Sequence, residues 1–260
     1  MWREYLQMRI AVITGASAGI GREFVYAADR EMTFDEIWVI ARREERLLEL
    51  REKCRNPIRP IPLDLSETEN VQRYRELLEK EKPEIGLLIN AAGCGVFGPF
   101  AEKDLDQLLM SARLNSLALT AMCHVSLPYM NRGAAIVNMG SNSAWQPVPW
   151  QAVYGASKSY VLNLSRAIGR ELKPRGIHVM CVCPGWIKTE FQKTAHHDEY
   201  IRYVDRWYGP DEVAKQAMKD LKKKKTVSIL GHPVRRQVRL VKFLPVKLVM
   251  DIWCKQQGIE

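Results

Sequence analysis

The sequence predicts a single doubly wound α/β domain, in which helices flank both faces of a seven-stranded parallel sheet. Two observations lead to this prediction. Seven short apolar segments, several of them nearly continuous in hydrophobic residues as in strands covered on both faces, alternate with longer segments whose apolar residues recur at helical spacing. Repeated strand–helix alternation in turn implies parallel strands joined by right-handed crossovers.

The elements follow one another without an internal repeat or a low-complexity linker. The predicted strands are residues 9–14, 37–41, 58–63, 86–91, 135–139, 178–183 and 227–230. The predicted helices are residues 44–54, 71–81, 104–129, 152–172 and 211–224, with another beginning at Arg22. We expect residues 1–232 to form the domain, with a substrate lid at about 186–210, and residues 233–260 to form a basic amphipathic extension.

Composition narrows the class of protein. The 260 residues carry a net charge of +9, and residues 215–260 alone hold 12 Lys or Arg against 3 Asp or Glu. Nucleic acid is not an expected partner, because no aromatic residues interleave with the basic ones as in a binding platform. The six cysteines lack zinc-ligand spacing, so no metal is expected. The first residues, Met1 to Glu4, lack the order of a signal peptide, and we expect a cytoplasmic protein.

A glycine-rich turn follows the first predicted strand directly. Residues 14–21 read Thr-Gly-Ala-Ser-Ala-Gly-Ile-Gly and lead into a helical segment. Glycines allow a tight turn, in which backbone N–H groups approach a pyrophosphate at the positive end of the helix. A glycine cluster alone also makes ordinary turns, but the strand before it and the helix after it favour a Rossmann-type dinucleotide site.

The end of the second strand indicates which dinucleotide binds. NAD-binding proteins of this type place an acidic residue about 20 positions after the last glycine. Here that position is Ala41, followed by Arg42 and Arg43. Guanidinium groups suit a 2′-phosphate, so the sequence predicts NADP(H) rather than NAD(H). The alternative is that the arginines begin a solvated helix.

A tyrosine and a lysine four residues apart supply a candidate acid/base pair. Tyr154 and Lys158 lie in a helical segment and therefore share one helix face. A phenol has an ordinary pKa of about 10, too high for proton exchange near neutrality. We expect the Lys158 ammonium to lower the pKa of Tyr154 toward the working range.

Several motifs accompany this pair in order along the chain. They are residues 14–21, Asp64, Asn90-Ala91-Ala92-Gly93, Asn115, Ser141, Tyr154 with Lys158, and Pro184-Gly185 with Thr189. Ser141 precedes Tyr154 by 13 residues. Over about residues 9–189 this arrangement resembles the classical short-chain dehydrogenase/reductase family. The likeness extends about equally to hydroxysteroid dehydrogenases and 3-oxoacyl reductases.

The resemblance implies a role for each matching catalytic residue. Tyr154 would exchange a proton with the carbonyl or alcohol oxygen of the substrate, and Ser141 would polarise that oxygen. Ser143 lies close enough to compete with Ser141 for this role. Lys158 would lower the pKa of Tyr154 and hold the nicotinamide ribose, and Asn115 would anchor a water that links Lys158 to solvent. Asn115 could alternatively break and cap its long helix.

The resemblance also implies a cofactor site that extends along the strand ends. Its residues would be Gly15, Ser17, Ile20, Gly21, Arg42, Arg43, Asp64, Leu65, Asn90, Gly93, Tyr154, Lys158, Pro184, Gly185, Ile187 and Thr189.

Aromatic residues gather in the segments that cover the substrate in this family. We expect Trp145, Trp150, Trp186 and Phe191 to contact the substrate beside Ser141 and Tyr154. These side chains favour a bulky lipophilic ketone or secondary alcohol, such as a hydroxysteroid. A 3-oxoacyl substrate is one alternative. A nucleotide-sensing protein without turnover is another, although such a protein would be expected to lose the tyrosine or the lysine.

The tail and the long helices suggest partners. Pro245 is expected to begin a final helix, on which Leu244, Leu248 and Ile252 form an apolar stripe. This stripe is expected to pack on the body or on a neighbouring subunit. The alternative is peripheral attachment to an anionic membrane. By resemblance, a homodimer or homotetramer would form through the helices at 104–129 and 152–172.

Overall fold

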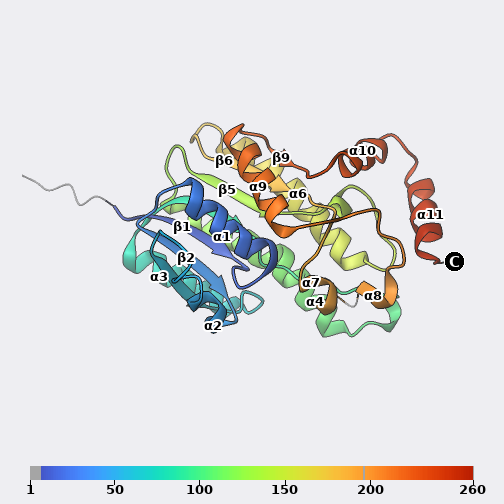
Figure 1. Cartoon of the computed structure of the whole chain (residues 1–260), viewed down its shortest axis with the longest axis horizontal. Helices are drawn as coiled ribbons and strands as arrows, with labels where there is room; N and C mark the ends of the chain where they lie inside the picture. Colours follow the sequence, from blue (N-terminus) through green and yellow to red (C-terminus); the bar gives the residue numbers. More distant parts are fainter. Residues whose placement is uncertain (1–6, 196, 260) are drawn as a thin grey trace, which may run out of the picture.

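A twisted parallel sheet forms the centre of the molecule (Figure 1). The structure is a computed structural model that describes residues 7–195 and 197–259. Within this part of the chain, seven strands pair in the order β3-β2-β1-β4-β5-β6-β9, and every pairing is parallel. The predicted fold class is therefore confirmed. The residues behind the expectation of no signal peptide, Met1 to Glu4, lie outside the described residues.

The strands match the predicted apolar segments to within two residues at each end. They are β1 (Arg9–Thr14), β2 (Glu36–Ala41), β3 (Ile58–Pro62), β4 (Glu84–Asn90), β5 (Ala135–Met139), β6 (His178–Val182) and β9 (Val227–Ser228). Two further strands, β7 (Trp186–Ile187) and β8 (Trp207–Tyr208), pair with each other inside the predicted lid.

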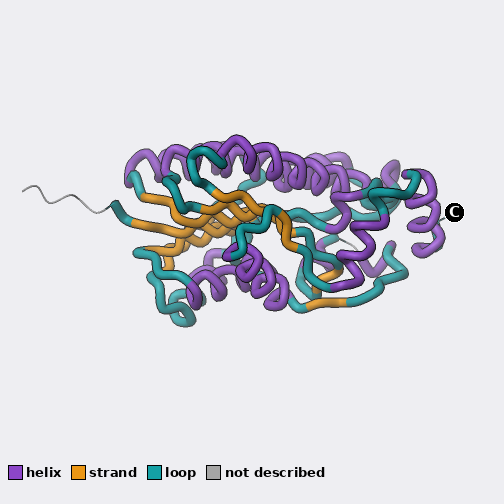
Figure 2. Tube along the Cα trace, turned by 90° about the horizontal axis from the view of Figure 1, so that it is seen from above, coloured by secondary structure: helices purple, strands orange, loops and turns teal. Residues whose placement is uncertain are grey.

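Helices cover both faces of the sheet, so the domain has three layers (Figure 2). They are α1 (Gly19–Glu31), α2 (Glu44–Leu48), α3 (Thr68–Glu81), α4 (Leu105–Ala112), α5 (Leu119–Ser126), α6 (Ala152–Leu172), α7 (Phe191–Thr194), α8 (His197–Tyr200), α9 (Pro210–Lys222), α10 (His232–Leu240) and α11 (Val246–Gln257). Shorter helical turns are η1 (Phe100–Glu102), η2 (Arg113–Ala118), η3 (Leu127–Tyr129) and η4 (Asn142–Trp145).

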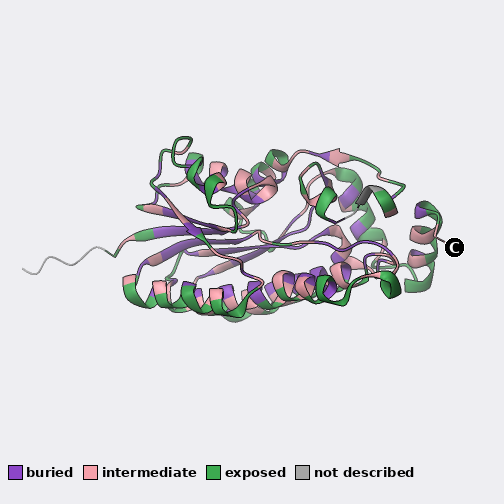
Figure 3. Ribbon diagram, turned by 90° about the horizontal axis from the view of Figure 1, so that it is seen from below, coloured by how far each residue is buried: buried purple, intermediate pink, exposed green. Residues whose placement is uncertain are grey.

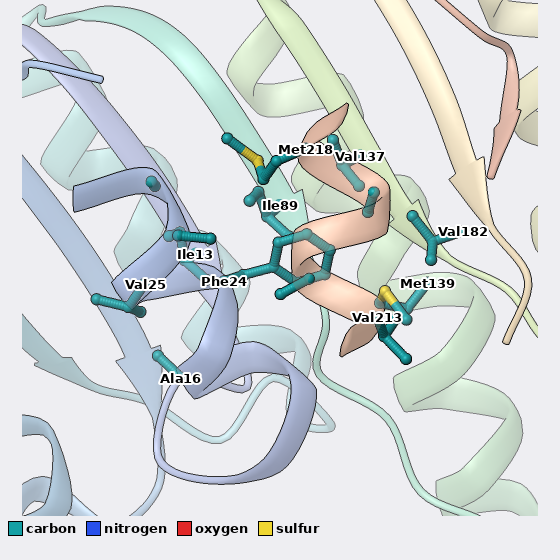
Figure 4. Close-up of a cluster of buried hydrophobic side chains, with 14 of the residues drawn as sticks. Ile13, Ala16, Phe24, Val25, Ile89, Val137, Met139, Val182, Val213 and Met218 are labelled. Atoms are coloured by element: carbon teal, nitrogen blue, oxygen red, sulfur yellow. The ribbon is translucent and has the colours of Figure 1, made fainter. Parts of the chain in front are cut away.

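Two hydrophobic cores lie on opposite faces of the sheet. Successive residues of a strand point to opposite faces, so Ile13 of β1 joins the core beneath α1 and α9, whereas Val12 joins the core beneath α3, α5 and α6. In the first core, Phe24 of α1 reaches toward Met218 of α9 and Ile89 of β4 (Figure 4). Burial is deepest in the strands and on the inner helix faces, and the outer helix faces are exposed (Figure 3).

The long predicted helix at 104–129 is not one uniform helix. Between α4 and α5, η2 is a π-helical turn that contains Asn115. Such a turn adds a residue to the hydrogen-bonded ring and often marks a functional site. Likewise, the predicted helix at 44–54 is α-helical only to Leu48. It then tightens, because Leu50 and Arg51 donate to carbonyl groups three residues earlier.

The tail contains one helix that was predicted and one that was not. The final helix is confirmed as α11, which begins directly after Pro245. The helix α10 was missed, although Pro233 in its first turn was a usable signal. Val234 and Val238 of α10 belong to the core beneath α1 and α9, so the chain after residue 232 is continuous with the domain.

The apolar stripe of α11 does not pack on the body. Leu244, Leu248 and Ile252 are all exposed, and the residues that α11 buries are Val249 and Gln257. The expectation that this stripe packs on the domain is therefore wrong, because the opposite face of the helix forms that contact. None of the helices in the described part of the chain is long and apolar enough to span a bilayer.

Candidate active site

A cleft of about 360 Å³ opens where β1, β4, β5 and β6 end. The strand order reverses between β1 and β4, and the carboxyl ends of parallel strands leave a crevice at such a point. Residues that follow all four strands line it, from Gly15 after β1 to Pro184 after β6. The sequence therefore brings together in space segments that are far apart along the chain.

The glycine turn leaves room for an anion at the start of α1. Gly15 has φ +67°, and a Cβ there would lie 2.7 Å from the carbonyl oxygen of Ala91. A Cβ on Gly21 would lie 2.2 Å from the Gly15 carbonyl oxygen. The preceding residue Ala18 makes no capping hydrogen bond, and the first turn of α1 contains no acidic residue. The first N–H groups of the helix are thus suited to hold a pyrophosphate.

Two arginines follow β2 directly and lie beside the glycine turn. Arg42 is exposed and lies 3.6 Å from Asp64, whereas Arg43 donates to Ser17 Oγ at 3.2 Å. Arg43 also contacts Glu190 at 2.7 Å, and Arg46 contacts the same carboxylate at 2.6 Å. The Arg46 and Arg43 guanidinium groups lower the pKa of Glu190 to about 2. Glu190 thereby ties the predicted lid to the turn between β2 and α2, a contact that sequence reasoning missed.

The acid/base residues meet deep in the cleft. Tyr154 and Lys158 lie one turn apart in α6, and the Lys158 Nζ is 5.6 Å from the Tyr154 ring centroid. Lys158 Nζ donates to the Met139 carbonyl oxygen at 2.9 Å. Ser141 lies two residues after the end of β5, and its Oγ accepts a hydrogen bond from Ser143 N–H at 3.1 Å. The strand end and the helix together aim these groups at one point.

Burial controls the pKa values of this pair. It raises the pKa of Tyr154 to about 12, against a smaller lowering by the hydrogen bond to Ser141. It lowers the pKa of Lys158 to about 8. The expected net lowering of the pKa of the phenol toward the working range is therefore not found, because desolvation of the phenolate is the largest effect on Tyr154 and Nζ of Lys158 is directed to Met139. Near neutrality the phenol is protonated and the amine is mostly charged.

Asn115 connects the loop after β4 to the first turn of α6. Its Oδ1 accepts from Cys94 N–H at 3.0 Å, and its Nδ2 donates to Cys94 O at 2.8 Å and to Ser157 Oγ at 3.1 Å. A Cβ on Gly93 would lie 2.9 Å from Asn115 Oδ1 and 3.5 Å from Lys158 Nζ. Asn115 thus lies behind the cleft, fully buried in the π-helical turn, and does not break the helix.

Aromatic side chains surround Tyr154. Its ring lies 5.6 Å from that of Phe97 and 5.5 Å from that of Phe191, between centroids. Trp186 also lines the cleft. Gln151 is 1% exposed and lines the same cleft, and its Nε2 has no hydrogen-bond partner among residues 7–195 and 197–259. Phe97 and Gln151 were missed by sequence reasoning, although Gln151 stands one helical turn before Tyr154.

Most of the residues that the sequence singled out line this cleft. They are Gly15, Ser17, Ile20, Gly21, Arg42, Arg43, Asp64, Leu65, Gly93, Ser141, Tyr154, Lys158, Pro184, Gly185, Trp186, Ile187, Thr189 and Phe191. Ser143 lines it as well.

Three candidates point elsewhere and require correction. Asn90 donates to Asn138 Oδ1 at 2.9 Å in the neighbouring strand, so it links β4 to β5 instead of bordering the cleft. Trp145 packs among the core residues, with cations of Arg166 and Lys242 over its ring at 4.6 and 4.4 Å. Trp150 packs against Tyr200, with 5.7 Å between ring centroids.

The lowered pKa of Lys158 predicts an unusual pH dependence of stability. Between the folded value of about 8 and the ordinary 10.5, the unfolded chain binds more protons than the folded chain, so this residue makes stability rise with pH. Below both values the residue is charged in either state and its destabilisation is complete. Lys158→Met lacks this dependence. The stability advantage of the variant should therefore shrink by up to roughly 3 kcal/mol from neutral pH to the upper end of this window.

Urea unfolding of both proteins at the two pH values measures this difference. Both proteins contain Tyr154, whose opposite contribution above pH 10 cancels in the comparison. Stability curves that stay parallel across the window would contradict the lowered pKa.

Comparison with known proteins shows the family. A family model described as short chain dehydrogenase matches residues 9–200. Sulfoacetaldehyde reductase 2 of Chromohalobacter salexigens is 34% identical over 191 residues, covering 70% of this chain and 74% of that protein.

Solved structures show the same fold over nearly the whole chain. A short-chain dehydrogenase from Sphingobium yanoikuyae in complex with NADPH has a TM-score of 0.78 at 27% identity, covering 94% of this chain and 96% of that one. The bulky-bulky ketone specific alcohol dehydrogenase from Comamonas testosteroni has a TM-score of 0.73 at 27% identity, covering 90% and 91%. Together with the geometry of the cleft, these findings show that the chain belongs to the short-chain dehydrogenase family and is an oxidoreductase of that type.

Proposed function

We propose that this protein interconverts a secondary alcohol and a ketone with NADP(H), and that its substrate is bulky and lipophilic, with a hydroxysteroid as the leading class. The observation that carries this proposal is the convergence of Tyr154, Ser141 and Lys158 in a cleft with an anion-binding turn at its other end. The nicotinamide, when bound, would give or take the hydride. The protein would supply position and charge stabilisation.

The proton chemistry follows from the burial of Tyr154. A phenol with a pKa of about 12 stays protonated at neutral pH and can donate to the substrate oxygen as negative charge develops there during reduction. Ser141 Oγ is placed to hydrogen-bond the same oxygen. The mostly charged Lys158 adds a positive charge near the phenol, which favours the phenolate left after transfer. In the oxidation direction the acceptor of the alcohol proton would be the Tyr154 phenolate, a minor form at neutral pH because its pKa is raised to about 12.

The lining near Tyr154 supports a large apolar substrate. Phe97, Phe191 and Trp186 provide aromatic surface on the side of the cleft away from the glycine turn. The buried Gln151 amide offers one donor to a substrate oxygen, since an unpaired buried polar group is unfavourable. The ketone-specific relative noted above is consistent with this class. A 3-oxoacyl substrate is the alternative for the same surface.

A spectrophotometric assay of NADPH oxidation tests this function. Steroid ketones, 3-oxoacyl thioesters and small polar carbonyls form the panel. We expect turnover of the bulky apolar ketones, and Tyr154→Phe should lower kcat by a factor on the order of a hundred or more while NADPH still binds. Turnover confined to small polar carbonyls would refute the substrate class, and substantial activity of Tyr154→Phe would refute the assigned acid/base role.

The preference for NADP(H) rests on Arg42 and Arg43. Their guanidinium groups line the cleft at the end of β2, where a 2′-phosphate would be recognised by charge-assisted hydrogen bonds. Among the residues that the structure describes, Arg42 makes only the long contact with Asp64, so its donors remain available there. Arg43 is held by Ser17 and Glu190.

Substitution of Arg42 should change the affinities for NADPH and NADH in opposite directions. Arg42→Asp should weaken NADPH binding roughly ten- to a hundredfold and improve NADH binding, because the carboxylate repels a phosphate and accepts from a ribose hydroxyl. Fluorescence titration with both cofactors measures this change. Arg73→Asp, an equal charge change on the exposed face of α3, is the control and should alter neither affinity. Unchanged NADPH affinity in Arg42→Asp would remove the basis for this preference.

We also propose that the protein forms a homo-oligomer through α4, η2 and α6. These adjoining elements expose large apolar side chains, namely Leu105, Leu109, Leu117 and Tyr160. Leu117 is 63% exposed, and such clusters on a folded surface favour an interface.

A charge at the centre of this surface should prevent assembly. Leu117→Arg should shift the protein to monomers in sedimentation velocity, because a guanidinium would be buried without a partner. Leu48→Arg, at another exposed leucine outside this surface, on α2, is the control and should leave the oligomer unchanged. A wild-type monomer, or an unaltered oligomer of Leu117→Arg, would contradict the proposal.

A further inference from the structure

An apolar turn projects from the tail between α10 and α11. Every residue from Lys242 to Leu248 is exposed, and four of them are large and apolar: Phe243, Leu244, Val246 and Leu248. Phe243 is 86% exposed, more than any other large hydrophobic residue in the described part of the chain. We refer to these four residues as the tail patch. Burying apolar side chains in water-free surroundings is favourable, so a patch of this kind is suited to a partner.

The tail patch is held in place by the opposite side of α11. Trp253 Nε1 donates to the Pro149 carbonyl oxygen at 3.0 Å, and its ring stacks on Trp186. Gln257 Oε1 accepts from the N–H groups of Arg202 and Tyr203 at 2.9 and 3.0 Å. These contacts fix the orientation of α11, so the apolar side chains face outward as part of an ordered structure.

Basic residues accompany the tail patch. From His232 to Gln257 the tail carries six Lys or Arg and one Asp. Arg236 and Arg239 are exposed on α10, and Lys242 and Lys247 flank the turn itself. Lys247 pairs with the single Asp251 at 2.7 Å. An apolar patch surrounded by basic residues is complementary to an anionic lipid bilayer. Its negative headgroups attract the basic residues, and its acyl chains accept the apolar side chains.

Charge complementarity favours a lipid surface over a second copy of this chain. In a two-fold contact the same patch meets itself, so the basic residues of both copies would be brought together. The tail patch also lies on a projecting turn at one extremity of the molecule (Figure 1). A projecting apolar turn with a basic rim can enter the headgroup region without requiring a matching groove.

The tail lies beside the cleft, so a lipid surface at the tail would be close to the candidate active site. A groove of about 750 Å³ lies between α10, α11 and the predicted lid, and Leu240, Leu244 and Ile252 are among its lining residues. Asn142 and Trp186 line both this groove and the cleft. A lipid surface at the tail would therefore meet an apolar groove adjoining the active site.

We infer that this protein docks peripherally on membranes that contain anionic lipids, with the tail patch inserted at the headgroup boundary and Arg236, Arg239 and Lys247 contacting the headgroups. This inference does not depend on the identity of the substrate. It requires only that the apolar turn and its basic rim act together.

Co-sedimentation of the full chain with vesicles tests the docking. We expect binding to phosphatidylcholine vesicles that contain phosphatidylglycerol, little binding to phosphatidylcholine alone, and weaker binding at high salt. Phe243→Ser/Val246→Ser removes apolar surface, and Arg239→Gln/Lys247→Gln removes two charges. Each pair should weaken binding roughly tenfold or more. The substituted side chains are exposed, and thermal unfolding confirms that each variant is folded.

A matched control separates docking from general attraction of a basic protein. Lys219→Gln/Lys223→Gln removes the same charge from exposed positions in α9 and at its C-cap, and should leave vesicle binding unchanged. Absence of binding by the wild type, or equal losses in this control, would overturn the inference. So would a change in oligomeric state of Phe243→Ser/Val246→Ser in sedimentation velocity without vesicles, because the tail patch would then bind a second copy.

Discussion

The close approach of the glycine turn to the neighbouring strand is the constraint on which the site depends. Gly15 and Gly21 leave no space for a Cβ, and Thr14 Oγ1 accepts from both Ala91 and Ala92 N–H at 3.0 Å. These contacts lock the ends of β1 and β4 together where the strand order reverses. The start of α1 and the candidate acid/base residues on α6 therefore face one continuous cleft.

Burial at the inner end of this cleft determines how the proton is held. The same removal of water that raises the pKa of Tyr154 lowers that of Lys158, so both groups move toward their neutral forms. At neutral pH the pair is thus a protonated phenol beside an ammonium group whose pKa is lowered. From sequence alone the attraction between the two groups was foreseeable, but its size relative to desolvation was not, because desolvation depends on the packing of Phe97 and Phe191 around the phenol.

The sheet and most of the cleft could be predicted because they depend on local patterns. Buried parallel strands are continuous apolar runs, and the residues that follow them necessarily gather at one edge of the sheet. The residues whose positions were predicted wrongly differ in the orientation of their side chains, which local patterns do not determine. Asn90 is the last residue of β4, and its pairing with Asn138 turns its side chain away from the cleft. The orientation of Trp145 accompanies its contacts with the cations of Arg166 and Lys242. These residues lie far from it along the chain, so no local pattern reveals the contacts.

If Arg43 binds a cofactor phosphate as proposed, its contact with Glu190 makes the affinity for that phosphate and the position of the predicted lid thermodynamically reciprocal. Any anion that binds Arg43 competes with the Glu190 carboxylate of the predicted lid. A change that strengthens the ion pair of Glu190 therefore lowers the affinity for the anion by the same factor. The Glu190 side chain thus links the arginines after β2 to the segment that the sequence predicts to be the lid.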